Sequence, residues 1–339
     1  MKSFGRLLIA TFLSASALAV VSPASAQVGG NVCEDSSGHA TLIVSLQNDI
    51  DVEVLDWGGE GSPLIFLAGF GNTAHVFDEF AQFFSPEFRV IAITRRGFGA
   101  SSKPERGYGS VDRSGDILGV MDSMHIRSAT FAGHSLAGDE LSYLGANHSD
   151  RVNGLIYLDA YDYGDEKLVE FESQIPPEVN SFDTSSSRDS LSVYHYQAQQ
   201  VYSSGLHFPL TEICAQWNRD ENGKLLSSTS ERQGYSEENL MNEAEFEKIE
   251  APVLGIFASH SSFLSEDQRN SLTHEAQIRV ADSERVMHHL ISEQIHRFQT
   301  RLSHRRVERF PDSNHYVFLS NTRETVDLMM EFLESIDSD

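Results

Sequence analysis

Short apolar runs alternate with stretches of helical spacing over the first half of the chain. The runs that predict strands lie at residues 40–46, 52–55, 63–67, 89–93, 128–132 and 154–158. The stretches that predict helices lie at residues 73–84, 116–124 and 135–147. Apolar strands separated by helices are typical of βαβ units, in which helices cover both faces of a parallel sheet. The pattern therefore predicts an α/β fold with a mostly parallel, doubly wound sheet.

Residues 162–250 interrupt this alternation. The segment is rich in Ser, Glu, Asp, Gln and Tyr and shows only two helix-like stretches. The alternation then resumes with a strand at 253–257, a helical insertion at 266–303, a strand at 307–310 and a last helix at 322–336. We therefore expect residues 27–161 and 251–339 to form one α/β core, which carries residues 162–250 as an inserted helical cap.

The first 26 residues have the composition of an export signal. Lys2 and Arg6 precede an apolar run from Leu7 to Val21. Ala24–Ala26 then provides the small residues of a cleavage site. The run is short and contains Ser and Thr, which favours a cleaved signal peptide over a retained membrane anchor. We expect residues 1–26 to be removed and the protein to be periplasmic or secreted.

Charge and cysteine content narrow the class of protein. The 25 Lys and Arg residues stand against 50 Asp and Glu residues, so a nucleic-acid partner, which needs a basic face, is not expected. Two cysteines exclude a disulfide-rich scaffold and a cysteine-based zinc site. After export, Cys33 and Cys214 can form a disulfide, and two separate buried thiols are the alternative. The oligomeric state cannot be predicted from these features.

A candidate nucleophile lies where an apolar strand meets a helix. The segment Gly133–Gly138 reads GHSLAG, and it places Ser135 on the turn between the strand at 128–132 and the following helix. A serine on such a sharp turn is exposed at the carboxyl end of the strand, and small neighbours allow the backbone to bend. A helix cap at a glycine-rich turn is the alternative interpretation of this serine.

A serine hydroxyl needs a base to accept its proton. His315 lies in a loop between the last predicted strand and the last helix, and it follows Ser135 in chain order. The other histidines considered are His134, beside the serine, and those on the charged helical insertion, His288, His289, His296 and His304. No pair of candidate ligands at metal-binding spacing is accompanied by a third, so neither a metal nor a cofactor is predicted.

Four segments resemble the α/β-hydrolase fold family, in its serine-hydrolase branch of carboxylesterases and lactonases. In chain order they are Leu67–Gly71, Arg95–Ser101, Gly133–Ala137 and Asn314–Phe318. The resemblance covers most of the chain outside the cap, with Ala137 where a second glycine is usual. It implies a Ser135 nucleophile, a His315 base and an oxyanion hole formed by the backbone N–H groups of Phe70 and Leu136.

The acid that would orient His315 is less evident. The family usually places it after the seventh strand, where this chain has Ala258–Ser262 without a carboxylate. Some members place it after the sixth strand, and here Asp159 follows the strand at 154–158 directly. The alternatives are Asp162, Glu266 and Asp267. A site that lacks its acid, with Asp159 only capping a helix, is the remaining possibility.

These features imply an exported serine hydrolase that cleaves small or medium carboxylic esters or lactones. Two alternatives remain open. In the first alternative, the same residues catalyse amide, peptide or C–C bond hydrolysis, or cofactor-free peroxidation. A binding protein on the same fold, without catalysis, is the second alternative.

Overall fold

The computed structural model describes residues 33–160, 192–194, 196–198, 205–230, 244–259, 264 and 266–337. The expected signal peptide and much of the expected cap lie outside these residues. Within the described ranges, no helix combines the length and the apolarity needed to cross a bilayer.

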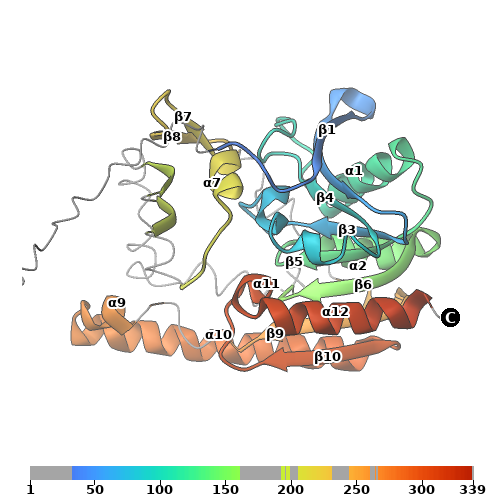
Figure 1. The fold of residues 1–339 in the computed structure, drawn as a ribbon. Coiled ribbons are helices and arrows are strands. Elements are labelled where there is room, and N and C mark those ends of the chain that lie inside the picture. Colours follow the sequence, from blue (N-terminus) through green and yellow to red (C-terminus); the bar gives the residue numbers. More distant parts are fainter. Residues whose placement is uncertain are drawn as a thin grey trace, which may run out of the picture. The chain divides into compact units, whose positions relative to one another are not determined.

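An eight-stranded sheet forms the centre of the fold (Figure 1). Its strands are β1 (Ala40–Ser45), β2 (Asp51–Gly58), β3 (Pro63–Leu67), β4 (Arg89–Thr94), β5 (Ala129–His134), β6 (Val152–Leu158), β9 (Val253–Ala258) and β10 (Arg305–Phe310). Their spatial order is β1-β2-β4-β3-β5-β6-β9-β10. The β1–β2 and β2–β4 pairs are antiparallel, and all other neighbours are parallel. The predicted α/β fold with a mostly parallel sheet is confirmed.

The helices lie close to the predicted positions. They are α1 (Ser110–Ser123), α2 (Ala137–Asn147), α7 (Leu210–Gln216), α9 (Glu266–Asn270), α10 (His274–Arg301), α11 (Val317–Ser320) and α12 (Thr322–Asp337). The predicted helix at 73–84 is wrong, because this segment forms two separate 3₁₀ turns, η2 (Ala74–Phe77) and η3 (Ala81–Phe83). Phe77 ends η2 and Phe80 precedes η3, and both rings contact Phe66, at 5.0 and 5.8 Å between ring centroids.

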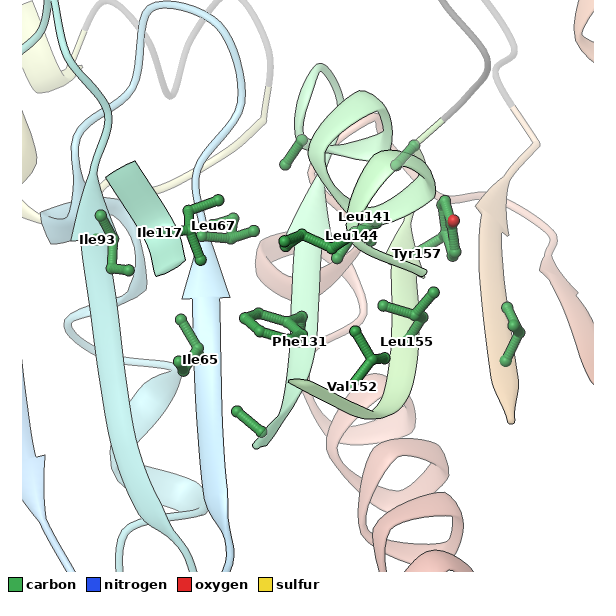
Figure 2. Packing of buried hydrophobic residues seen from close by; sticks show 14 of the residues in the cluster. Ile65, Leu67, Ile93, Ile117, Phe131, Leu141, Leu144, Val152, Leu155 and Tyr157 are labelled. Atoms are coloured by element: carbon green, nitrogen blue, oxygen red, sulfur yellow. The ribbon is translucent and has the colours of Figure 1, made fainter. Parts of the chain in front are cut away.

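Each face of the sheet carries its own apolar cluster. On one face, side chains of α1 and α2 pack over β3, β5 and β6, and Figure 2 shows Leu141 and Leu144 of α2 beside Phe131 of β5 and Leu155 of β6. On the other face, η2, η3, α11 and α12 cover the strands. Because both faces of the central strands β3, β4, β5, β6 and β9 are covered, these strands are largely apolar, and the sequence pattern could reveal them.

A disulfide joins the start of the described chain to α7. Cys33 and Cys214 are bonded, with their Cα atoms 5.8 Å apart and 181 positions between them in sequence. After α7 the chain forms a short hairpin of β7 (Trp217–Arg219) and β8 (Leu225–Ser228). The pairing of the two cysteines, which the sequence left open, is thus found in the structure.

Candidate active site

Ser135 occupies a strained turn between β5 and α2. Its φ is +53°, in the left-handed region that non-glycine residues seldom adopt, and such a conformation costs about 1–3 kcal/mol. Gly133 makes the turn possible, because a Cβ there would lie 2.9 Å from both Ala137 Cβ and Leu141 Cδ1. The turn therefore has the expected geometry of a nucleophile elbow, and Ser135 is 9% exposed.

Asp159 is the first residue after β6, the strand next to β5 in the sheet. Its side chain is fully buried, and its backbone also has a positive φ, +46°. Oδ1 accepts the backbone N–H of Ala258 at 2.8 Å. Oδ2 lies 2.7 Å from Nδ1 of His315. Two oxygens with separate partners hold the carboxylate in one orientation, with one oxygen directed at the imidazole.

His315 lies in the loop between β10 and α11. Ser313 shapes this loop, because its hydroxyl donates to the Phe310 carbonyl at 2.7 Å and accepts the N–H of Ser259 at 3.1 Å. The His315 side chain is 32% exposed, whereas the Asp159 carboxylate that faces its Nδ1 is buried. The imidazole is therefore oriented from its buried edge and still open to solvent.

His134, directly before the serine, links the elbow to this loop. Its Nε2 lies 3.0 Å from the carbonyl oxygen of His315, and the two rings lie 4.6 Å apart between centroids. Burial and the nearby His315 hold the pKa of His134 well below its usual range. The ring is therefore neutral and carries one N–H. This N–H is on Nε2, where it donates to the His315 carbonyl.

The loop after β3 lies against the elbow. A Cβ on Gly69 would be 3.0 Å from Ser135 Cβ and 2.7 Å from His134 Nδ1, so only glycine allows this approach. Phe70 follows in this loop and is 40% exposed, while Leu136 begins α2 and is buried. The backbone N–H groups of these last two residues are thus carried by segments that meet at Ser135.

Arg95 fixes this loop from behind. Its guanidinium donates to the Ala68 carbonyl at 2.9 Å, to the Gly69 carbonyl at 3.3 Å and to Glu140 Oε1 at 2.6 Å. Arg113 also lies 3.5 Å from the same Glu140 oxygen. Burial raises the pKa of Glu140, but the charges of the two arginines outweigh burial and lower it. Sequence reasoning missed this role, and the only signal was an Arg directly after an apolar strand.

A second set of contacts joins α7 to the same loop. Glu212 is fully buried and accepts Asn72 Nδ2 at 2.9 Å and the Thr73 N–H at 3.1 Å. The Tyr316 hydroxyl donates to Asn72 Oδ1 at 3.0 Å. A cleft beside Phe70 is lined by this tyrosine and Asn72 and, from the 162–250 segment, by Tyr196, Gln216, Trp217 and Ser228. The segment expected to be a cap thus supplies side chains beside the candidate site.

Two of the other candidate acids lie on a different element. Glu266 and Asp267 are exposed at the start of α9, and Asp162 lies outside the described residues. His288, His289 and His296 lie on α10, and His304 lies between α10 and β10. The ends of β3, β5 and β6 and the loop after β10 meet around Ser135, His134 and Asp159.

Comparison with known proteins identifies a family model and several relatives of this chain. The family model of the alpha/beta hydrolase fold matches residues 62–322. A putative non-heme haloperoxidase of Mycobacterium phage D29 is 31% identical over 123 residues, which are 36% of this chain and 43% of that protein. A 2-(acetamidomethylene)succinate hydrolase of Mesorhizobium japonicum is 31% identical over 105 residues, 31% of this chain and 38% of that protein. The matched region thus spans less than half the length of these relatives.

Solved structures share the fold over a larger part of the chain. The crystal structure of E-2-(acetamidomethylene)succinate hydrolase superposes with a TM-score of 0.61 at 20% identity, covering 87% of this chain and 99% of that one. The enol-lactonase from Burkholderia xenovorans LB400 gives 0.54 at 18% identity, covering 86% and 100%. Because the family model covers most of the chain and the sheet has the same architecture, this chain belongs to the alpha/beta hydrolase fold family.

Proposed function

We propose that this chain is a serine hydrolase that cleaves small or medium carboxylic esters or lactones. The observation that carries the proposal is the 2.7 Å contact between His315 Nδ1 and the buried Oδ2 of Asp159, at the carboxyl ends of the strands where Ser135 lies on its strained turn. A buried carboxylate that accepts the Nδ1–H fixes the tautomer in which Nε2 can take a proton.

The reaction then follows two balanced steps. Ser135 Oγ attacks the acyl carbonyl while His315 Nε2 accepts its proton, and the backbone N–H groups of Phe70 and Leu136 stabilise the oxyanion. The alcohol leaves with the proton held by His315. Water attacks the acyl-enzyme next, with His315 again as base, and releases the acid and the free serine.

The names of the relatives support hydrolysis at a carbonyl group. They include a bifunctional esterase/perhydrolase of Acinetobacter calcoaceticus and the 2-(acetamidomethylene)succinate hydrolase, and the enol-lactonase shares the fold. We therefore place esters and lactones first, and amides or C–C bonds as substrates that the same residues can serve.

Export is part of this proposal. The sequence of residues 1–26 and the Cys33–Cys214 disulfide both support a periplasmic or secreted protein, because disulfides persist in oxidising compartments. Mass spectrometry of the protein from its host tests this directly. A mature chain that begins at Gln27 and carries the disulfide is expected, and a retained N-terminus would contradict it.

The hydrolase proposal is tested with p-nitrophenyl esters of increasing acyl length, together with a small lactone series. We expect turnover by the wild type and none by Ser135→Ala, with fluorophosphonate labelling of the wild type only. The matched control is Ser142→Ala on the following helix α2. Absence of both turnover and labelling in the wild type would contradict an activated serine and would favour a binding protein.

Perhydrolysis is a second candidate, because several relatives are named non-heme chloroperoxidases. In this reaction hydrogen peroxide replaces water in the second step and releases a peracid. Halogenation of monochlorodimedone in the presence of acetate, bromide and hydrogen peroxide tests it. Bromination that depends on acetate and on Ser135 would support it, and bromination by Ser135→Ala would exclude it.

A further inference from the structure

Four potential metal ligands lie together away from Ser135. Asp35 and His39 belong to the segment before β1, His75 lies in η2, and Asp78 follows that turn. One ligand atom from each lies within 4.8 Å of all the others. Asp35 Oδ2 is 3.0 Å from His39 Nε2 and 3.6 Å from His75 Nδ1. His75 Nδ1 is in turn 3.0 Å from Asp78 Oδ2.

Two of these atoms are buried and form no hydrogen bond of good geometry among the described residues. They are His39 Nε2 and Asp78 Oδ1, which lie 3.2 Å apart as a close nitrogen–oxygen pair. Both side chains are only 1% exposed. Polar atoms buried without a well-formed hydrogen bond cost free energy, and a cation bound between these two would satisfy both.

Oxygen atoms lie near the second nitrogen of each imidazole and near the Asp78 carboxylate. Nδ1 of His39 lies 3.5 Å from the Thr41 hydroxyl, and Nε2 of His75 lies 3.9 Å from Glu53 Oε1. The Thr211 hydroxyl donates to Asp78 Oδ2. Histidines that bind metals usually present their other nitrogen to an oxygen in this way, which fixes the ring and its tautomer.

We propose that Asp35, His39, His75 and Asp78 bind a divalent transition-metal ion, with Zn²⁺ as the best match. Two imidazoles and two carboxylates are ligand types that Zn²⁺ accepts, with bonds of about 2.0–2.2 Å. Tetrahedral ligands at such bonds lie roughly 3.3–3.5 Å from one another. Three of the six separations in the cluster, 3.0, 3.2 and 3.6 Å, are close to these values, and all six are within 4.8 Å.

The proposed site is structural rather than catalytic. Four protein ligands close a tetrahedral zinc site, whereas catalytic zinc keeps a position for water or substrate. The ion would hold the segment after Cys33 against η2. Through Asp78 and Thr211 it would also hold α7, whose Glu212 supports the loop that carries Phe70.

Direct contacts among the four side chains are the alternative to a bound ion. Without a metal, the cluster would be a network of close imidazole–carboxylate pairs, since His39 and His75 each lie within 3.2 Å of an Asp78 oxygen. A metal titration distinguishes the two states, because such a network takes up no stoichiometric ion.

The test uses the untagged protein after chelation and dialysis, titrated with Zn²⁺ and, separately, with Co²⁺. We expect one equivalent of either ion per chain, a higher melting temperature and the strong visible absorption of tetrahedral Co²⁺. Less than about a fifth of an equivalent at saturating zinc, or weak octahedral Co²⁺ absorption, would overturn the proposal.

Variants assign the binding to these residues. His39→Gln and Asp35→Asn should each weaken zinc binding by about tenfold or more. The control is His289→Gln, because this imidazole is 73% exposed on α10 and should leave binding unchanged. Asp35 is partly exposed, so its substitution tests the site even where His39→Gln fails to fold. Unchanged affinity in both variants would overturn the assignment.

Discussion

Arg95 Nε donates to Glu140 Oε1 at 2.6 Å, and both side chains are buried beneath the candidate site. Glu140 belongs to α2, the helix that follows the Ser135 turn. Arg95 also donates to two carbonyls of the loop after β3, so it connects this loop with α2. A single guanidinium therefore sets the spacing between the two segments that would carry the oxyanion donors.

Removing this guanidinium should affect both stability and rate. We expect Arg95→Met to lower the free energy of unfolding by about 3–5 kcal/mol, because Glu140 loses a partner in a buried site. We also expect kcat for ester hydrolysis to fall by up to about 100-fold, because the loop after β3 is no longer held in place. Urea unfolding and steady-state kinetics measure the two effects. Arg306→Met is the control, since its exposed ion pair with Glu331 should contribute only about 0–1 kcal/mol.

Glu140 should make the stability depend on pH in a defined direction. Its pKa is lowered in the folded protein, so the folded state binds its proton less readily than the unfolded chain does. The stabilisation is therefore complete above the unfolded value of about 4.5 and is lost as the pH falls through the folded value. Glu140→Gln should be less stable at pH 7 and show a smaller decline below pH 4.5 in urea unfolding. An equally steep decline in the variant would contradict this.

His134 should act on the rate through His315. His134→Phe keeps a ring among His315, Tyr316 and Phe318 but loses the hydrogen bond to the His315 carbonyl. A bond of about 1 kcal/mol corresponds to roughly fivefold in rate, so we expect a decrease of this size in kcat with little change in KM. A change confined to KM would mean that His134 contacts the substrate instead.

The choice among the carboxylates can be decided by kinetics. Asp159→Asn should lower kcat by about 10³- to 10⁴-fold, because the amide no longer stabilises the imidazolium or the required tautomer. Asp267→Asn on α9 is the matched control and should have no effect. A loss of only a few-fold in Asp159→Asn would direct attention to Asp162.

The sequence was sufficient to predict those candidate residues that directly follow a buried strand. Ser135 and Asp159 each come directly after an apolar strand, and buried strands are recognisable because both faces of the sheet are covered. The helix at 73–84 was predicted wrongly, because apolar residues three positions apart fit an α-helix and 3₁₀ turns equally well.

The cluster of Asp35, His39, His75 and Asp78 could not be predicted from the spacing of metal ligands in the sequence. Its two halves lie more than thirty positions apart and meet only when β1, β2 and η2 are assembled. The same is true of Arg95 and Glu140, which have no sequence pattern in common.

The order in which the two cysteines are made has a consequence for how the protein matures. Cys33 is synthesised 181 residues before Cys214, which at ordinary elongation rates of about 5–20 residues per second is a delay of roughly ten to forty seconds. During that interval Cys33 has no partner in its own chain, because the sequence contains only two cysteines. An incorrect bond can therefore form only between chains. Slow or crowded maturation should produce covalent dimers rather than scrambled monomers, and non-reducing electrophoresis separates the two.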